Sequence, residues 1–208
     1  MPGSGRPLVV ALVGPAGAGK SVVREALAER GAATLDFDDY SRELLRPGTE
    51  QYRCLRAEFG PEVFRPDGSV DRGALGALVF SDSAARERLN AILHPAMLAL
   101  LREAIASFRS RPTAPLLVVE GAILAQLPTE GWFDRLVLVT ARPAIRGQRL
   151  QETKGLSGEA ANALIRLHDE MGVGRDRADE VVGNDGGLCA LKARVDELWG
   201  TLVGGGTE

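Results

Sequence analysis

A glycine-rich loop near the N-terminus constrains this chain more than any other feature. Residues 14–21 read GPAGAGKS, which is a complete G-x-x-x-x-G-K-[ST] pattern. The loop follows a short β-branched run, Leu8–Val13, and precedes apolar residues at helical spacing over Ser21–Arg30, which end at Gly31. A strand, a glycine-rich turn and a helix in this order predict a loop that cradles the phosphates of a nucleotide.

Each residue type in the loop has a physical role in that prediction. The glycines let backbone N–H groups converge on phosphate oxygens, and the helix N-terminus adds its partial positive charge. We expect the Lys20 ammonium to reach the β and γ phosphates and the Ser21 hydroxyl to bind Mg²⁺. ATP and Mg²⁺ are therefore the expected cofactors, and the nucleotide is expected to contact Ala16, Gly17, Ala18, Gly19, Lys20, Ser21 and Val22.

The rest of the chain alternates strand-like and helix-like segments. Short apolar runs predict further strands at 34–38, 116–120, 136–140 and 180–182, before an amphipathic helix at 188–202. Between residues 40 and 111 the pattern is helical. It is broken at Pro47-Gly48, Gly60-Pro61, Pro66-Asp67-Gly68 and His94-Pro95, which predicts several short helices and one longer pair. This order predicts an α/β fold with a mainly parallel sheet of five strands, whose ligands bind beyond the carboxyl ends of the strands.

Composition excludes several classes of function. The 208 residues carry 25 Lys+Arg and 28 Asp+Glu, a net charge of −3, which argues against a nucleic-acid or anionic-membrane partner. No run approaches the ~18 apolar residues of a membrane span, so we expect a cytoplasmic protein. The two cysteines lie far apart without metal-ligand spacing, which argues against a structural zinc site or a disulfide framework. The sequence also lacks the N-K-x-D motif by which GTPases read the base, which argues against a GTPase. A short chain with these properties points to a small-molecule kinase.

Three acids follow the second predicted strand. If residues 34–38 form a strand, alternation sends Asp36 and Asp38 to one side, where one could accept a proton from an attacking hydroxyl and the other could orient metal-bound water. We expect Asp39 to cap the helix that begins near Tyr40.

These motifs, in this order, resemble the dephospho-coenzyme A kinase family from Leu8 to about Trp199. The matching segments are GPAGAGKS, DFDDYSRELLRPG, Phe59-Gly60, DGSVDRGALGALVF, LNAILHP, QRL and ADEVVGN. The resemblance implies phosphorylation of the ribose 3′-hydroxyl of dephospho-CoA to give coenzyme A, the final step of its biosynthesis. It also implies a three-layer α/β/α P-loop kinase fold in one domain, residues 1–208, and a monomer or small homo-oligomer. Its parts would be a core at about 7–42, 114–142 and 178–203, a helical acceptor-binding region at 43–113 and a lid at 143–177.

Site residues carry over from the resemblance by position. Asp38 matches the general base toward the ribose hydroxyl, and Arg149 matches the lid arginine that neutralises the transferring phosphoryl group. The acceptor would lie along Arg42, Arg72 and His94. Asn184 matches the adenine side of the nucleotide site.

The chain also departs from the family in two places. The family's P-L-L-x-E is missing after the third strand, where Glu120-Gly121 looks like the E-G of uridine kinases, whose acid lies near Mg²⁺. Glu120 therefore joins Ser21 and Asp36 as a candidate Mg²⁺ residue. The lid has Thr153-Lys154 where the family has Arg-Asp, and His168-Asp169-Glu170 where it has Gln-Met-Pro. Two alternatives therefore stay open: a kinase for a nucleoside or another small alcohol, and a catalytically weakened nucleotide-binding relative.

Overall fold

The computed structural model describes residues 7–171 and 177–204, and the chain divides into two compact units. The first unit comprises Met1–Asp36 and Ile105–Glu208, and the second comprises Phe37–Ala104.

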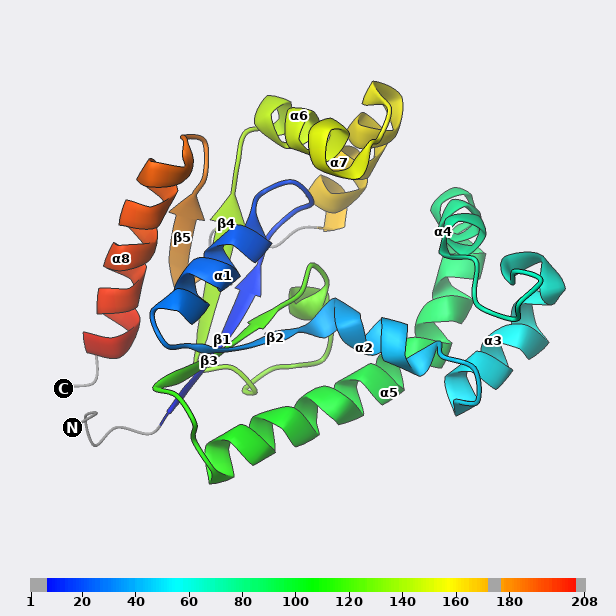
Figure 1. Ribbon diagram of the computed structural model, residues 1–208, viewed down its shortest axis with the longest axis horizontal. Helices are drawn as coiled ribbons and strands as arrows, with labels where there is room; N and C mark the ends of the chain where they lie inside the picture. The colour runs from blue at the N-terminus through cyan, green and yellow to red at the C-terminus, as the bar shows by residue number, and fades with distance from the viewer. Residues whose placement is uncertain (1–6, 172–176, 205–208) are drawn as a thin grey trace. The chain divides into compact units, whose positions relative to one another are not determined.

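The first unit is built on a five-stranded parallel sheet (Figure 1). The strands are β1 (Leu8–Val13), β2 (Ala33–Asp36), β3 (Leu116–Glu120), β4 (Arg135–Thr140) and β5 (Glu180–Gly183), in the order β2-β3-β1-β4-β5. All five predicted strands are present, within two residues at each end. Because β1 and β3 are buried on both faces, they are nearly continuous apolar runs rather than alternating ones.

Two helices cover one face of this sheet. They are α1 (Lys20–Glu29) and α8 (Leu188–Gly204), which pack beside each other (Figure 1). Leu27 of α1 and Val195 of α8 are fully buried in one cluster with Val10 and Leu12 of β1. Burying one such side chain contributes roughly 1.5–3 kcal/mol, so this cluster holds α1 against the strand that precedes the loop.

A different set of residues faces the opposite side of the sheet. Ala11 of β1 alternates with Val10 and Leu12, and it lines a hollow with Leu124 and Leu127. Leu124 begins the short 3₁₀ helix η2 (Leu124–Gln126), which contacts β1. The sheet therefore carries packed segments on both faces, as the sequence predicts.

The second unit is helical. It contains α2 (Phe37–Leu44), α3 (Glu50–Phe59), the 3₁₀ helix η1 (Pro61–Val63), α4 (Arg72–Ser81) and most of α5 (Ser83–Ser110). Side-chain caps set two of the helix starts: the Thr49 hydroxyl accepts from the Tyr52 N–H, and Asp71 accepts from the N–H groups of Gly73 and Ala74. The predicted breaks at residues 47–48, 60–61 and 66–68 are confirmed.

The predicted break at His94-Pro95 is wrong, because α5 continues through Pro95. An internal proline removes one helical hydrogen bond and costs about 3 kcal/mol. A stripe of buried residues at spacings of three and four offsets that cost; its members are Leu93, Met97, Leu101, Ile105 and Phe108. Among the described residues, α5 is the one helix long and apolar enough to cross a membrane, a test that a helix packed on a protein core also passes.

The boundary between β2 and α2 also differs from the prediction. The strand ends at Asp36 and α2 begins at Phe37, so the predicted strand over 34–38 is two residues too long. The alternation argument for Asp38 therefore fails, since Asp38 lies in the first turn of a helix. Asp39 lies in the same turn rather than before it, so the prediction that it caps the helix is wrong. Carboxylates in a first turn favour helix formation there through the helix dipole.

Candidate active site

The glycine-rich loop has the backbone geometry of an anion site. It connects β1 to α1, and its glycines at 14, 17 and 19 have φ angles of 149°, 76° and 92°. Gly19 is the N-cap of α1 in a left-handed conformation, with no side-chain cap. The orphan N–H groups at the start of α1 therefore face the loop, where they and the helix dipole favour a bound anion.

Two of these glycines are required by close neighbours as well as by their φ angles. A Cβ at Gly17 would lie 2.8 Å from the carbonyl oxygen of Arg146 in α6 (Pro143–Lys154). A Cβ at Gly19 would collide with the side-chain amide of Asn184. The loop is thus in close contact with α6 and with Asn184, the residue that follows β5.

The predicted loop residues contribute in different ways. The Lys20 ammonium donates to the carbonyl oxygen of Gly14 at 2.9 Å, which keeps it beside the loop. Ser21 and Val22 are exposed in the first turn of α1, whereas the Ala18 side chain is fully buried in the core. The Ala18 side chain is therefore not accessible to a ligand.

Asn184 ties three parts of the site together. Its side chain is buried, and its amide nitrogen donates to the Ala18 carbonyl at 2.8 Å. Its amide oxygen accepts from Nη2 of Arg149 at 3.3 Å, and Nη1 of Arg149 lies 3.5 Å from the Gly17 carbonyl. The structure therefore brings Asn184 and Arg149 onto the phosphate loop, with Asn184 in contact with the loop backbone.

Two acidic residues end neighbouring strands at the carboxyl edge of the sheet. Asp36 ends β2 and is the register partner of Glu120, which ends β3. Glu120 Oε2 lies 2.8 Å from Nε of Arg24 in α1, although this approach lacks hydrogen-bond geometry, and both side chains are largely buried. The charge of Glu120 is therefore balanced by a residue that the sequence did not single out.

This donor set suits a hard cation that keeps several water ligands. The Ser21 hydroxyl and the carboxylate oxygens at the sheet edge are the ligand types that Mg²⁺ prefers. Within residues 7–171 and 177–204, no group of three His, Cys, Asp or Glu residues stands close enough to hold a metal alone. These residues therefore suit a Mg²⁺ ion that is bound together with a nucleotide, rather than one held by protein ligands alone.

The second unit contains its own basic cluster. Arg42 forms an ion pair with Asp39, one turn earlier in α2. Partial burial lowers the pKa of Arg72, and the neighbouring positive charge of Arg42 lowers it further, while Asp39 opposes the shift. Burial also lowers the pKa of His94. Two guanidinium groups held near each other favour an anionic ligand.

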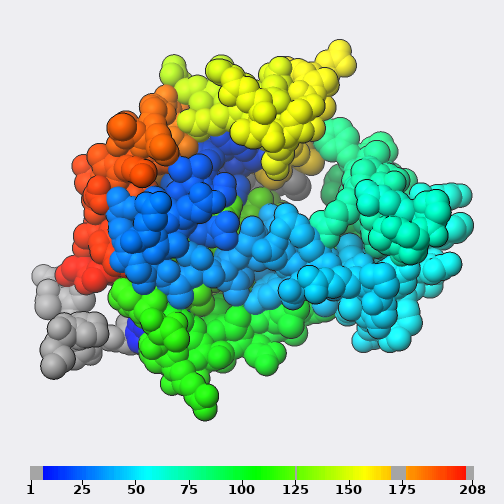
Figure 2. All heavy atoms as spheres, in the orientation of Figure 1, coloured from blue at the N-terminus to red at the C-terminus, as the bar shows by residue number. Residues whose placement is uncertain are grey.

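The predicted lid forms two helices in the first unit, α6 and α7 (Gly158–Met171). In the space-filling view their yellow surface adjoins the blue surface of the N-terminal segment (Figure 2). Leu150, Ala161 and Ile165 form a small buried cluster against which Ala16 of the loop packs. The part of the predicted lid at 172–176, and the side chain of Glu170, lie outside the described residues.

Arg146 is a further contact that the sequence did not reveal. Only 3% of its surface is exposed, and its Nε donates to the Ala16 carbonyl at 2.9 Å. Its position three residues before Arg149 on one helix was the available signal, since residues at that spacing share a face.

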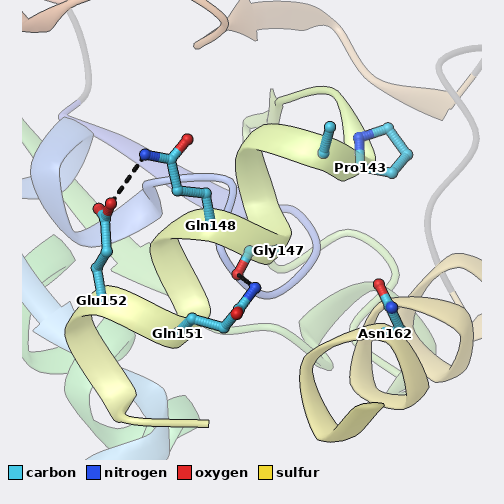
Figure 3. Close-up of a pocket in the computed structure, with 7 residues that line it drawn as sticks. Pro143, Gly147, Gln148, Gln151, Glu152 and Asn162 are labelled. Atoms are coloured by element: carbon cyan, nitrogen blue, oxygen red, sulfur yellow. Dashed lines mark hydrogen bonds between the residues drawn. The ribbon is translucent and has the colours of Figure 1, made fainter. Parts of the chain in front are cut away.

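A hollow of about 400 Å³ on the same helices has no residue of the phosphate loop in its lining. It is lined by residues of α6 and by Asn162 of α7, and Gln148 donates to Glu152 across its rim (Figure 3). None of the predicted site residues lines it.

Known proteins match this chain along nearly its full length. The family model described as dephospho-CoA kinase matches residues 8–190. A dephospho-CoA kinase of Moorella thermoacetica is 36% identical over 93% of this chain and 92% of its own length. A crystal structure from Thermus thermophilus is 31% identical, with a TM-score of 0.76 over 95% of this chain and 99% of that one.

A third match supports the fold. The structure of dephospho-CoA kinase from Campylobacter jejuni has a TM-score of 0.63 at 17% identity, and it covers 96% of this chain and 98% of its own. These likenesses agree with a three-layer α/β/α kinase fold. On the extent of the family match and the identity to its members, the chain belongs to the dephospho-CoA kinase family.

Proposed function

We propose that this protein transfers the γ-phosphoryl group of ATP to the ribose 3′-hydroxyl of dephospho-CoA and so completes coenzyme A. The observation that carries the proposal is that Arg149 of the predicted lid and Asn184, which follows β5, both contact carbonyls of the phosphate loop. The family match spans the loop, the second unit and both lid helices.

The loop residues would bind and orient the nucleotide. The N–H groups of Gly17 and Gly19 and those at the start of α1 would surround the phosphates, and the Lys20 ammonium would move from the Gly14 carbonyl to a phosphate oxygen. Ser21, Asp36 and Glu120 are the residues that would hold Mg²⁺, which would neutralise charge on the phosphates when bound with the nucleotide. Arg149, always protonated, stabilises the charge on the transferring group.

Asp38 would remove the proton from the acceptor hydroxyl. It follows Asp36 by two residues, so chain connectivity keeps its Cα within about 7 Å of the Cα at the end of β2. The proton passes to the Asp38 carboxylate as the hydroxyl oxygen forms its bond to phosphorus and ADP leaves. Arg42 and Arg72 would bind anionic groups of the acceptor, with His94 along the same site.

A coupled assay of ADP release with purified protein tests the proposal. Dephospho-CoA should raise ADP release well above the rate with ATP and buffer alone. Uridine and ribosyl nicotinamide, assayed in parallel, represent the nucleoside kinase alternative suggested by Glu120-Gly121. Turnover with one of them, or ATP binding with no turnover on any acceptor, would replace the proposed reaction.

The proposal extends to the protein's partners, location and oligomeric state. A net charge of −3 gives no basic surplus for nucleic acid or anionic lipid, so we expect small-molecule partners alone. We propose a cytoplasmic monomer or small homo-oligomer, which sedimentation of the purified protein would test.

A further inference from the structure

The strongest unexplained feature of the first unit is the buried guanidinium of Arg146. Besides its bond to the Ala16 carbonyl, its Nη1 donates to Oδ1 of Asp169 in α7 at 2.6 Å. Its Nη2 is buried and has no hydrogen-bond partner among the described residues. Burying an ionised group at this depth is costly unless it is paired and hydrogen-bonded, and here the pairing is incomplete.

The bond to Ala16 acts on the neighbouring residue through peptide planarity. The Ala16 carbonyl and the Gly17 N–H belong to one planar peptide unit and point in opposite directions. Holding the carbonyl against Arg146 therefore fixes the direction of the Gly17 N–H. Gly17, with φ near 76°, has no side chain of its own to restrict this peptide unit, so its neighbours must do so.

The same device recurs along the loop. Arg149 lies against the Gly17 carbonyl and Asn184 holds the Ala18 carbonyl, so three successive peptide units have their oxygens contacted from outside. The Ala18 N–H is used inside the loop, by the Pro15 carbonyl at 3.2 Å. The N–H groups of Gly17 and Gly19 have no partner in the described part of the chain and remain available to a ligand.

We propose that Arg146 is a positioning residue that aims the Gly17 N–H at nucleotide phosphate, and that Asp169 acts through Arg146 by holding its guanidinium. The role in phosphoryl transfer rests on the proposed function, whereas the effect on nucleotide binding does not. Asp169, one of the residues at 168–170 that depart from the family pattern, therefore helps to position the phosphate loop.

Binding of ADP with Mg²⁺, measured by titration calorimetry, tests the effect of Arg146 on nucleotide binding separately from its role in phosphoryl transfer. Arg146→Gln should weaken ADP binding by about tenfold or more, the scale of one hydrogen bond to a charged group. Asp169→Asn should weaken it about threefold, because the Nε bond to Ala16 survives. Arg146→Lys should fall between wild type and Arg146→Gln, since an ammonium cannot make both bonds of the fork.

A double variant tests whether Asp169 works through Arg146. Arg146→Gln combined with Asp169→Asn should bind ADP as Arg146→Gln alone does, because the second change has no partner left to affect. Arg166→Gln, an exposed arginine of α7, removes the same charge and should bind ADP like the wild type. In kinetics, the KM for ATP should rise while the KM for dephospho-CoA stays unchanged.

The outcomes are decisive in either direction. Wild-type ADP affinity in Arg146→Gln, or independent and multiplying effects in the double variant, would overturn the proposal. If Arg146→Gln does not fold, Arg146→Lys and Asp169→Asn carry the test, with thermal melting to confirm their folding. A protein that binds ADP as predicted but ignores dephospho-CoA would refute the proposed reaction and leave the role of Arg146 intact.

Discussion

Replacing Asn184 should loosen the phosphate loop and lower the stability of the fold together. In Asn184→Ala the Ala18 carbonyl loses its donor at 2.8 Å and Arg149 loses an acceptor at 3.3 Å, in a position where 5% of the side chain is exposed. A buried carbonyl left without a partner costs about 1–3 kcal/mol, and the second bond is long and weak. We expect the free energy of unfolding to fall by about 2 kcal/mol.

Thermal unfolding and nucleotide titration measure the two effects. For a domain of this size, 2 kcal/mol corresponds to a fall in Tm of about 4–8 °C. Asn184→Asp is the matched control: it keeps the oxygen that faces Arg149 but places an acceptor against the Ala18 carbonyl, so it should be at least as destabilising. ADP affinity should fall in both variants. A loss below about 0.5 kcal/mol in Asn184→Ala, the range of ordinary surface substitutions, would refute the bridging role.

Three other predictions concern catalysis, the acceptor and pH. Asp38→Asn should lower kcat by about 10² or more and leave ADP affinity nearly unchanged, and near-normal turnover would remove Asp38 as the base. Arg42→Gln should raise the KM for dephospho-CoA and not the KM for ATP, and Arg53→Gln, an exposed arginine of α3, should change neither. Burial, followed by the positive charge of Lys20, lowers the pKa of His168 from 6.5, so the unfolded chain binds its proton first as the pH falls. The free energy of unfolding should therefore be highest above pH 6.5 and decline as the pH falls below it. His168→Gln should make that decline shallower, and an unchanged pH profile would contradict this reasoning.

The strand–loop–helix unit could be predicted because its determinants are local. A β-branched run, glycines at turn positions and apolar residues at helical spacing each restrict their own segment, and the structure places β1 and α1 within one residue of the prediction. Parallel pairing then fixes which ends of the strands meet, so Asp36 and Glu120 fall at one edge.

The errors occur where packing outweighs local sequence. Phe37 reads as part of a strand, but it is fully buried as the first residue of α2, and this moves Asp38 into a helix. Pro95 reads as a break, but the buried stripe of α5 continues on both sides of it. Helix propensity and turn preference are weak terms that such burial overrides.

The support of the loop could not be predicted because its partners lie far apart in the chain. Arg146 and Ala16 are separated by 130 residues, and an arginine on a helix is more often exposed than buried. The sequence shows the glycines, whereas the carbonyl contacts that orient them become visible only once α6 and β5 are placed beside the loop.

The most direct test of the account is the product formed from ATP and dephospho-CoA. Purified protein with Mg²⁺ should yield coenzyme A and ADP in equal amounts, with phosphorus NMR showing a new monoester at the ribose 3′ position and Lys20→Ala abolishing it. The central claim would be contradicted if ADP formed at the same rate with and without dephospho-CoA while the acceptor remained unmodified.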